Sequence, residues 1–99
     1  MNEKKLYVLV RKDHSKSKQA VQAGHAVAEY LLTNPRTEWK NGTLIYLQVP
    51  DEQTLKEWHS KLKDEASDLV WFTEPDIGDQ VTALACSGEP DKFEGMRLL

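Results

Sequence analysis

Four polar side chains in one helical segment have the types and the spacing that a small reaction site needs. The segment SKSKQAVQAGHAVAEYLL carries Lys18, Gln22, His25 and Glu29 among residues that are mostly Ala, Val, Leu and Gly. Because these side chains recur every three or four residues, an α-helix places them in one stripe. The stripe is either the solvated side of an amphipathic helix or the wall of a site.

The stripe begins with a cation at the start of the helix, where backbone amides favour anions. Lys16 and Lys18 follow directly after the first predicted strand, and open α/β sheets bind ligands beyond the carboxyl ends of their strands. These lysines can hold a phosphate or a developing oxyanion, or they are solubilising residues of a loop. Gln22 can order a water or contact a ribose or a base edge. His25 is a base, a phosphate contact or a hydrogen-bonded structural residue.

A second group of candidate residues lies in the acidic turn EPDIGDQVT. This turn contains the carboxylates Glu74, Asp76 and Asp79 and the hydroxyl of Thr82. A carboxylate near Lys18 would combine a general base with an electrostatic stabiliser, which is the minimum for water to attack an ester. An ordinary polar turn is the alternative interpretation, and the carboxylate spacing matches no EF-hand loop.

The apolar pattern predicts the elements that must position these residues. Strands are expected at 5–11, 43–49, 68–74 and 81–87, and helices from about 17 to 33 and over 50–65. The buried side of the first helix is expected to contain Ala20, Ala23, Gly24, Val27, Tyr30 and Leu31. This order predicts a single α/β domain over residues 1–99, with a small four-stranded mixed β-sheet flanked by helices on both faces. Parallel first and third strands would bring the acidic turn to the start of the first helix.

Composition places further limits on the function. An apolar content of 39% and a charged content of 29% are ordinary for a globular chain of 99 residues. No apolar run approaches the length of a membrane span, so no membrane partner is expected. Cys86 is the single cysteine, which excludes an intrachain disulfide and favours a cytoplasmic location. The net charge of −3 is unevenly distributed, because residues 1–18 carry six basic and two acidic side chains. Such a basic end can steer a phosphate-bearing partner or simply be solvated.

The segment LVRKDHSKSKQAVQAGHAVAEYLL resembles the signature of the archaeal/eukaryotic-type peptidyl-tRNA hydrolases. In that family a strand leads into a Gly-Lys-Gly-Lys loop and then into a helix with Ala-Gln-x-x-His-Ala. Lys16 and Lys18 match the two lysines, with serines in place of the glycines, and the helix motif is matched by Gln22, His25 and Ala26. Further similarities at VPDEQTLKEW, VTALA and KFEGMRLL extend the resemblance over nearly the whole chain.

The resemblance implies an enzyme, often a homodimer, that hydrolyses the ester between a peptide and the 3′ end of tRNA. It implies a catalytic group of Lys18, Asp76 and Thr82. It also implies a substrate-binding group of Lys16, Gln22 and His25. Peptidyl-tRNA would be the partner, and neither a cofactor nor a metal ion is required. Lys18 would stabilise the anionic tetrahedral intermediate or hold the terminal phosphate. Asp76 would orient or deprotonate the attacking water, and Thr82 would hydrogen-bond to that carboxylate or to the water.

The acidic loop departs from the family pattern. The family reads Asp-Ala-Gly-Arg-Thr-Gln at this place, whereas this chain has the shorter EPDIGDQ without the arginine. Asp76 is the expected counterpart of the family's aspartate. Glu74 or Asp79 takes its place if the gap that aligns this shorter loop with the family's loop is shifted.

Two other functions are compatible with the sequence. The shortened acidic loop favours a non-catalytic module of the same fold that binds tRNA or another nucleic acid. A protein-interaction domain would instead use the first helix or exposed tryptophans, with Trp39 as the first candidate because it lies in a predicted loop.

Overall fold

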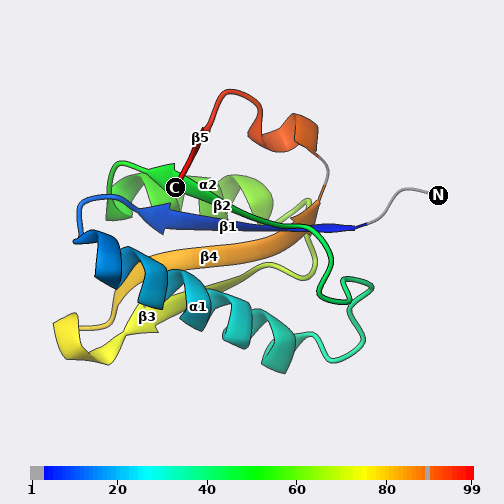
Figure 1. Ribbon diagram of the computed structural model, residues 1–99, viewed down its shortest axis with the longest axis horizontal. Coiled ribbons are helices and arrows are strands. Elements are labelled where there is room, and N and C mark those ends of the chain that lie inside the picture. The colour runs from blue at the N-terminus through cyan, green and yellow to red at the C-terminus, as the bar shows by residue number, and fades with distance from the viewer. Residues whose placement is uncertain (1–3, 89) are drawn as a thin grey trace.

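Alternating strands and helices build a mixed sheet in the computed structural model, which describes residues 4–88 and 90–99 (Figure 1). The elements in chain order are β1 (Lys5–Arg11), α1 (Lys16–Thr33), β2 (Leu44–Val49), α2 (Glu52–Leu62), β3 (Val70–Glu74), β4 (Gln80–Gly88) and β5 (Arg97–Leu98). Short 3₁₀ helices cover Pro75–Ile77 and Pro90–Phe93. The structure therefore contains the four strands and two helices that the apolar pattern predicts, with small differences at their ends.

The strand order of the sheet is β3-β4-β1-β2-β5. β1 is parallel to β2, and β4 is antiparallel to both of its neighbours, β1 and β3. β3 consequently runs in the same direction as β1, although β4 lies between them. The carboxyl ends of β1 and β3 lie at the same edge of the sheet, which is the geometry that the acidic turn needs to approach α1 (Figure 1).

The prediction of a small mixed α/β sheet is confirmed, but the predicted number of four strands is wrong. A fifth strand, β5, pairs antiparallel with β2 through Leu47↔Leu98 and Gln48↔Arg97. Two residues are too few to show the alternation of apolar and polar side chains by which a strand is recognised in a sequence. The C-terminal segment therefore forms both a helical turn and a short strand.

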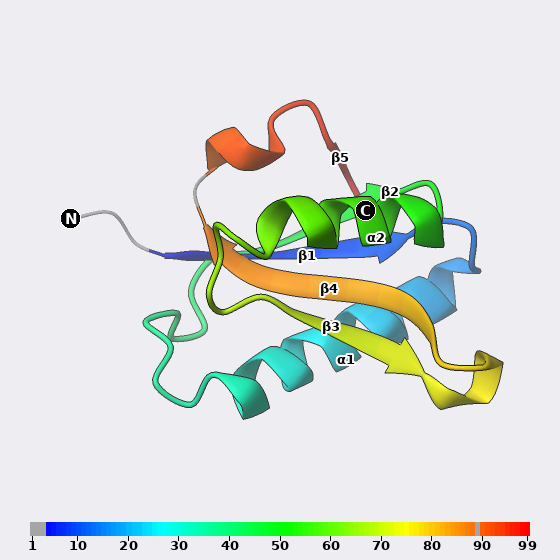
Figure 2. The same cartoon turned by 180° about the vertical axis from the view of Figure 1, so that it is seen from behind.

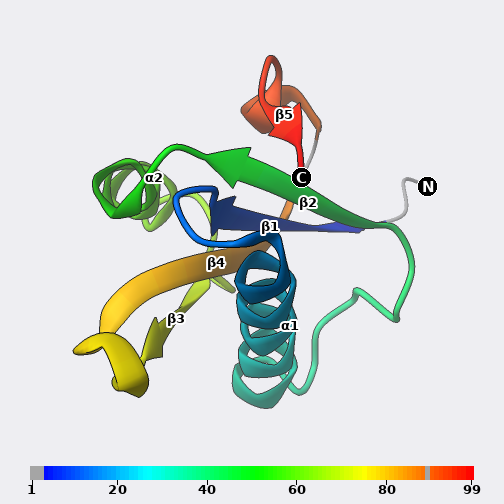
Figure 3. The same ribbon diagram turned by 60° about the vertical axis from the view of Figure 1, so that its left-hand side comes forward.

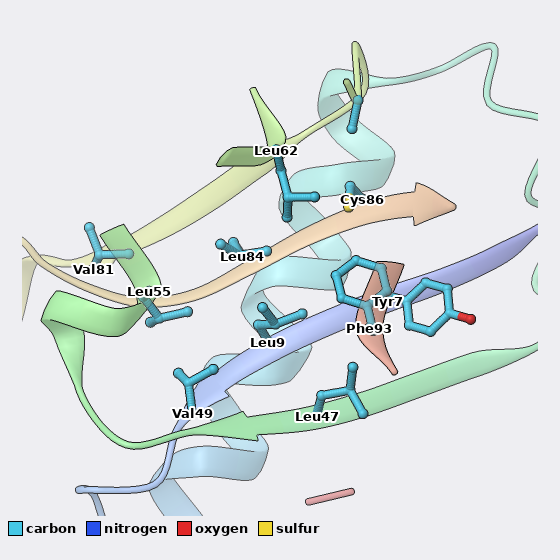
Figure 4. Packing of buried hydrophobic residues seen from close by; sticks show 11 residues of the cluster. Tyr7, Leu9, Leu47, Val49, Leu55, Leu62, Val81, Leu84, Cys86 and Phe93 are labelled. Carbon is cyan, nitrogen blue, oxygen red and sulfur yellow. The ribbon is translucent and has the colours of Figure 1, made fainter. Parts of the chain in front are cut away.

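The two helices cover opposite faces of the sheet (Figure 3). Successive side chains of a strand point to opposite faces, so β1 contributes Leu6, Val8 and Val10 to the core under α1 and Tyr7 and Leu9 to the core under α2. The core under α2 is shown in Figure 4, where Leu55 and Leu62 of α2 point toward the strand residues. The sheet is thus covered by α1 on one side and by α2 on the other, as the view from behind also shows (Figure 2).

The buried face of α1 differs from the prediction. The predicted residues Ala20, Gly24 and Leu31 are exposed. The buried residues of this helix are Gln19, Gln22, Ala23, Ala26 and Tyr30. The prediction ranked side chains by polarity, whereas two glutamines are buried here because their amides find hydrogen-bond partners inside the protein.

Trp39 is buried, so its predicted role as an exposed binding residue is wrong. Only 3% of its surface is exposed, and its indole Nε1 donates a hydrogen bond to the Thr43 carbonyl at 2.9 Å. Its ring also lies edge-on to Tyr30 beside α1. Position in a loop does not imply exposure here, because Trp39 belongs to the core under α1.

The packing of α2 on the sheet predicts a large difference between two leucine variants. Leu55 is fully buried and Leu32 is 80% exposed. We expect Leu55→Ala to lower the free energy of unfolding by about 2 to 5 kcal/mol. We expect Leu32→Ala to change it by less than about 0.5 kcal/mol. Urea unfolding followed by circular dichroism measures both values, and equal effects would contradict the packing of α2.

Candidate functional site

A cleft of about 350 Å³ lies between the start of α1 and the end of β3. These two segments meet at one end of the molecule (Figure 1). The cleft, called the α1–β3 cleft below, is lined by His14, Ser17, Lys18, Val21, Gln22, His25, Glu74, Asp76 and Ile77. Three residues of the polar stripe and two carboxylates of the acidic turn therefore come together, although more than 45 residues separate them in the chain.

Local hydrogen bonds fix the point at which α1 begins and so the position of Lys18. Ser15 is the N-cap residue, and its side-chain oxygen accepts a hydrogen bond from the Lys18 amide at 3.3 Å. The buried Gln19 donates from Nε2 to the His14 carbonyl at 2.7 Å. The loop before the helix is thereby held against its first turn. The lysine side chain itself is exposed at the mouth of the cleft.

Arg11 joins this loop to the start of β4. Its guanidinium donates two hydrogen bonds of 2.9 Å to the Asp13 carboxylate, and it also donates to the Gln80 side chain and the Val81 carbonyl. The hydrogen bond from Arg11 and the charge of its guanidinium hold the pKa of Asp13 below its ordinary value, although burial acts in the opposite direction. Arg11 as a whole is only 7% exposed. Its charge is matched by Asp13, so we interpret Arg11 as a structural residue that ties the loop before α1 to the start of β4.

A chain of hydrogen bonds connects β4, α1 and the end of β3 behind the cleft. Thr82 Oγ1 donates to Gln22 Oε1 at 2.6 Å, and Gln22 Nε2 donates to Glu74 Oε2 at 3.0 Å. The Asp76 amide donates to the other oxygen of Glu74 at 3.4 Å. The acceptor and donor sides of the Gln22 amide are therefore both used, which fixes its orientation.

Within residues 4–88 and 90–99, the Thr82 hydroxyl donates to Gln22 rather than to a carboxylate, so only the second of its two expected roles, a contact with the water, remains as a prediction. Its side chain is 1% exposed, and the carboxylate that it reaches through Gln22 is Glu74 rather than Asp76. Thr82 lies where the pairing of β3 and β4 shifts by one residue, between Phe72↔Ala83 and Thr73↔Val81. Such an irregularity turns a side chain in a new direction, and here Thr82 also lies within 3.4 Å of the Phe72 carbonyl.

The hydrogen bonds to Glu74 stabilise its ionised form. The contact from Gln22 is the main cause that holds the pKa of Glu74 below its ordinary value, and the Asp76 amide and the nearby His25 act in the same direction. Burial opposes this effect but is outweighed. Glu74 is therefore a carboxylate at neutral pH, and it faces the same cleft as the Lys18 ammonium.

His25 stacks on Phe72 of β3. The two ring centroids are 4.5 Å apart, and the ring planes differ by 12°. Phe72 is half-buried, whereas His25 is exposed and lines the cleft. The imidazole is thus supported from one side by an aromatic ring.

The structure brings together most of the predicted site residues but separates two of them. Lys18, Gln22, His25 and Asp76 line the α1–β3 cleft, and Glu74, the alternative to Asp76, lines it too. Thr82 is buried behind Gln22. The predicted binding residue Lys16 lies instead in a neighbouring cavity of about 510 Å³ with Lys12, Gln19, Gln48 and Leu99. Residues two positions apart in an α-helix are rotated by about 200° around the helix axis, so the side chains of Lys16 and Lys18 do not face the same cavity.

The apolar residues of the cleft were missed by sequence reasoning. Val21 and Ile77 line it beside the polar groups. Val21 is 55% exposed, and its position three residues after Lys18 was the available signal, since that spacing puts both on the same side of the helix. Within residues 4–88 and 90–99, no three His, Cys, Asp or Glu side chains lie together as a metal site. Burial raises the pKa of the Cys86 thiol to about 12, so this cysteine is not a nucleophile at neutral pH.

Comparisons with known proteins support the fold. No protein-family model matches the chain, and no curated protein matches its sequence. Its structure is similar to that of a protein of unknown function from Agrobacterium tumefaciens, with a TM-score of 0.71 and 11% sequence identity over 100% of this chain and 99% of the other. At this identity the likeness extends to the fold alone. In the part of the chain that the structure describes, neither helix is long and apolar enough to cross a membrane.

The Gln22–Glu74 hydrogen bond predicts how the pKa of Glu74 responds to substitution. Gln22→Met removes the donor, so we expect the pKa of Glu74 to rise toward its ordinary value in an NMR titration of the side-chain carboxyl carbon. The folded pKa of Glu74 is depressed, so its contribution to stability is present above the unfolded pKa and is lost as the pH falls through the folded pKa. The variant should lose less stability over this acidic range than the wild type.

The matched control for this titration is Gln53→Met, because Gln53 donates to Glu57 on the exposed side of α2. It should leave the pKa of Glu74 unchanged. An unchanged pKa in Gln22→Met would show that the hydrogen bond does not hold the carboxylate in its ionised form.

Proposed function

We propose that this protein hydrolyses the ester bond between the peptide and tRNA in peptidyl-tRNA. The observation that carries the proposal is the α1–β3 cleft, which combines the Lys18 ammonium with the carboxylates of Glu74 and Asp76. The resemblance of the α1 segment to the peptidyl-tRNA hydrolases supports the same substrate class. Hydrolysis of this ester recycles tRNA during translation, and the proposed compartment is accordingly the cytoplasm.

Lys18 would stabilise the negative charge that develops on the carbonyl oxygen of the ester. Its ammonium lies at the third position of α1, where the first amides of the helix lack intrahelical acceptors and the helix dipole is positive. An anionic tetrahedral intermediate placed in the cleft would meet the Lys18 ammonium and the positive end of the helix dipole without prior rearrangement. Electrostatic stabilisation of this kind is commonly the largest single contribution to catalysis of acyl transfer.

The two carboxylates would divide the handling of the attacking water. Asp76 remains our first candidate to accept its proton. Glu74 is held by Gln22 and by the Asp76 amide, so it would orient the water and the Gln22 amide. The second N–H of that amide, which Glu74 does not use, would donate to the substrate.

The proposal predicts a specific order of activities among variants. We expect Lys18→Ala and Asp76→Asn each to lower kcat about 100-fold or more, because each removes a group that acts in the transition state. Glu74→Gln should lower kcat about ten-fold if it only orients the water. The measurement is the release of N-acetyl amino acid from N-acetyl-aminoacyl-tRNA under saturating conditions.

Lys40→Ala and Asp91→Asn are the matched controls, because both residues are exposed and lie outside the cleft. Both should keep wild-type turnover. Full activity of Lys18→Ala would refute the proposed mechanism. Full activity of Asp76→Asn, together with complete loss in Glu74→Gln, would make Glu74 the general base. A wild-type protein that binds the tRNA and leaves the ester intact would be a binding module instead.

Binding of tRNA should depend steeply on salt. Each phosphate neutralised by a lysine releases counterions, so affinity falls as the salt concentration rises. Lys12 and Lys16 lie together at the neighbouring cavity and would contact the backbone of the acceptor stem. We expect Lys16→Ala to reduce the slope of log Kd against log salt by about 1, with Lys40→Ala unchanged. A slope near zero for the wild type would instead indicate a protein partner.

A further inference from the structure

The stacked pair of His25 and Phe72 forms a small aromatic platform in the cleft. Phe72 covers one face of the imidazole with nearly parallel ring planes, 12° apart. His25 is exposed and lines the α1–β3 cleft, so its ring is accessible to a ligand that enters the cleft. An exposed ring that is fixed in orientation by a second ring beneath it is suited to stack on a third planar group.

The position of this platform matches the length of a nucleoside. His25 lies seven residues beyond Lys18 on the same stripe of α1, which corresponds to about 10 Å along the helix axis. A ribose with its base bridges a gap of this order. Val21 lies between the two residues on that side of the helix and supplies an apolar contact. A ligand whose reacting oxygen lies at Lys18 can therefore extend a planar group to His25.

We propose that His25, supported by Phe72, stacks on the base of the terminal nucleotide of tRNA. This inference rests on the proposed function and names the part of the substrate that the platform holds. Aromatic and histidine side chains commonly stack on unpaired bases in single-stranded ends of RNA. The terminal nucleotide is the same adenosine in every tRNA, whereas the peptide differs from one substrate molecule to the next. A fixed planar platform therefore suits the base better than the peptide.

The structure offers a matched control for this role. His59 of α2 also stacks on an aromatic ring, Trp71 of β3, with ring centroids 4.0 Å apart. This second pair lies outside the α1–β3 cleft. His25→Ala and His59→Ala each remove one stacked imidazole, but only His25→Ala should weaken the binding of the terminal base.

The experiment uses an uncharged acceptor-stem RNA with 2-aminopurine as its 3′-terminal base. The fluorescence of 2-aminopurine falls on stacking, and the RNA carries no ester, so the result is independent of hydrolysis. His25→Ala should weaken binding about five-fold to 100-fold and abolish the quenching. His25→Phe should keep both within about three-fold of the wild type, since it preserves a ring. His59→Ala should behave as the wild type.

A second RNA with an abasic 3′-terminal residue completes a double-mutant cycle. The wild type should bind this abasic RNA as weakly as His25→Ala binds the intact RNA. Combining His25→Ala with the abasic RNA should weaken binding little further. Additive losses would overturn the stacking, as would equal losses in His25→Ala and His25→Phe. Either of these two contrary results would leave the proposed hydrolase function intact if the wild type still cleaves N-acetyl-aminoacyl-tRNA. If the wild type does not hydrolyse the ester but the cycle shows coupling between His25 and the terminal base, the hydrolase function alone is refuted. If none of the RNAs binds, both the stacking and the hydrolase function are overturned.

Discussion

The arrangement of the cleft depends on the buried amide of Gln22. An amide that is removed from water is costly unless its donor and acceptor groups are satisfied. Gln22 meets this requirement by accepting from Thr82 of β4 and donating to Glu74 at the end of β3. Both partners lie on the same side of the helix, so they fix the rotation of α1 on the sheet. Lys18, one turn before Gln22, and His25, one turn after it, are then directed to the edge where the acidic turn begins.

The topology of the sheet makes this contact possible. β3 and β1 end at the same edge because the antiparallel β4 lies between them. β4 then supplies the residue that joins the two sides, since the register shift at Thr82 places a hydroxyl under α1. Arg11 holds the same edge from the opposite side of β4 through Asp13 and Gln80. The cleft is therefore lined by α1 and the end of β3 as well as by the turns beside them, and side chains on the helix and strand are held at a more precise spacing than side chains on loops.

The apolar pattern was sufficient to predict β1 at its observed bounds and α2 to within a few residues at each end, because both depend on short-range signals. The meeting of Lys18 with the acidic turn was also predictable, since it requires only parallel directions of two strands. The buried face of α1 was not, because the burial of Gln22 depends on a hydroxyl that is 60 residues away in the chain. β5 depends on its pairing with β2, and the burial of Trp39 depends on its packing with Tyr30 in the core under α1, which no local pattern specifies.

The environment of Glu74 has a consequence for the proposed chemistry. Hydrogen bonds that hold its pKa low keep it ionised but also make it a weaker base. A general base is most effective when its pKa lies near the working pH, so Glu74 is better suited to orient a water than to take its proton. Most of the lowering of the barrier would then come from the Lys18 ammonium, which lines the cleft, and from the positive end of the α1 dipole. The acidic turn lacks an arginine, and Glu74 is its carboxylate that is fixed by hydrogen bonds. Such a turn would remain compatible with ester hydrolysis, because Lys18 and the start of α1 supply the positive charge.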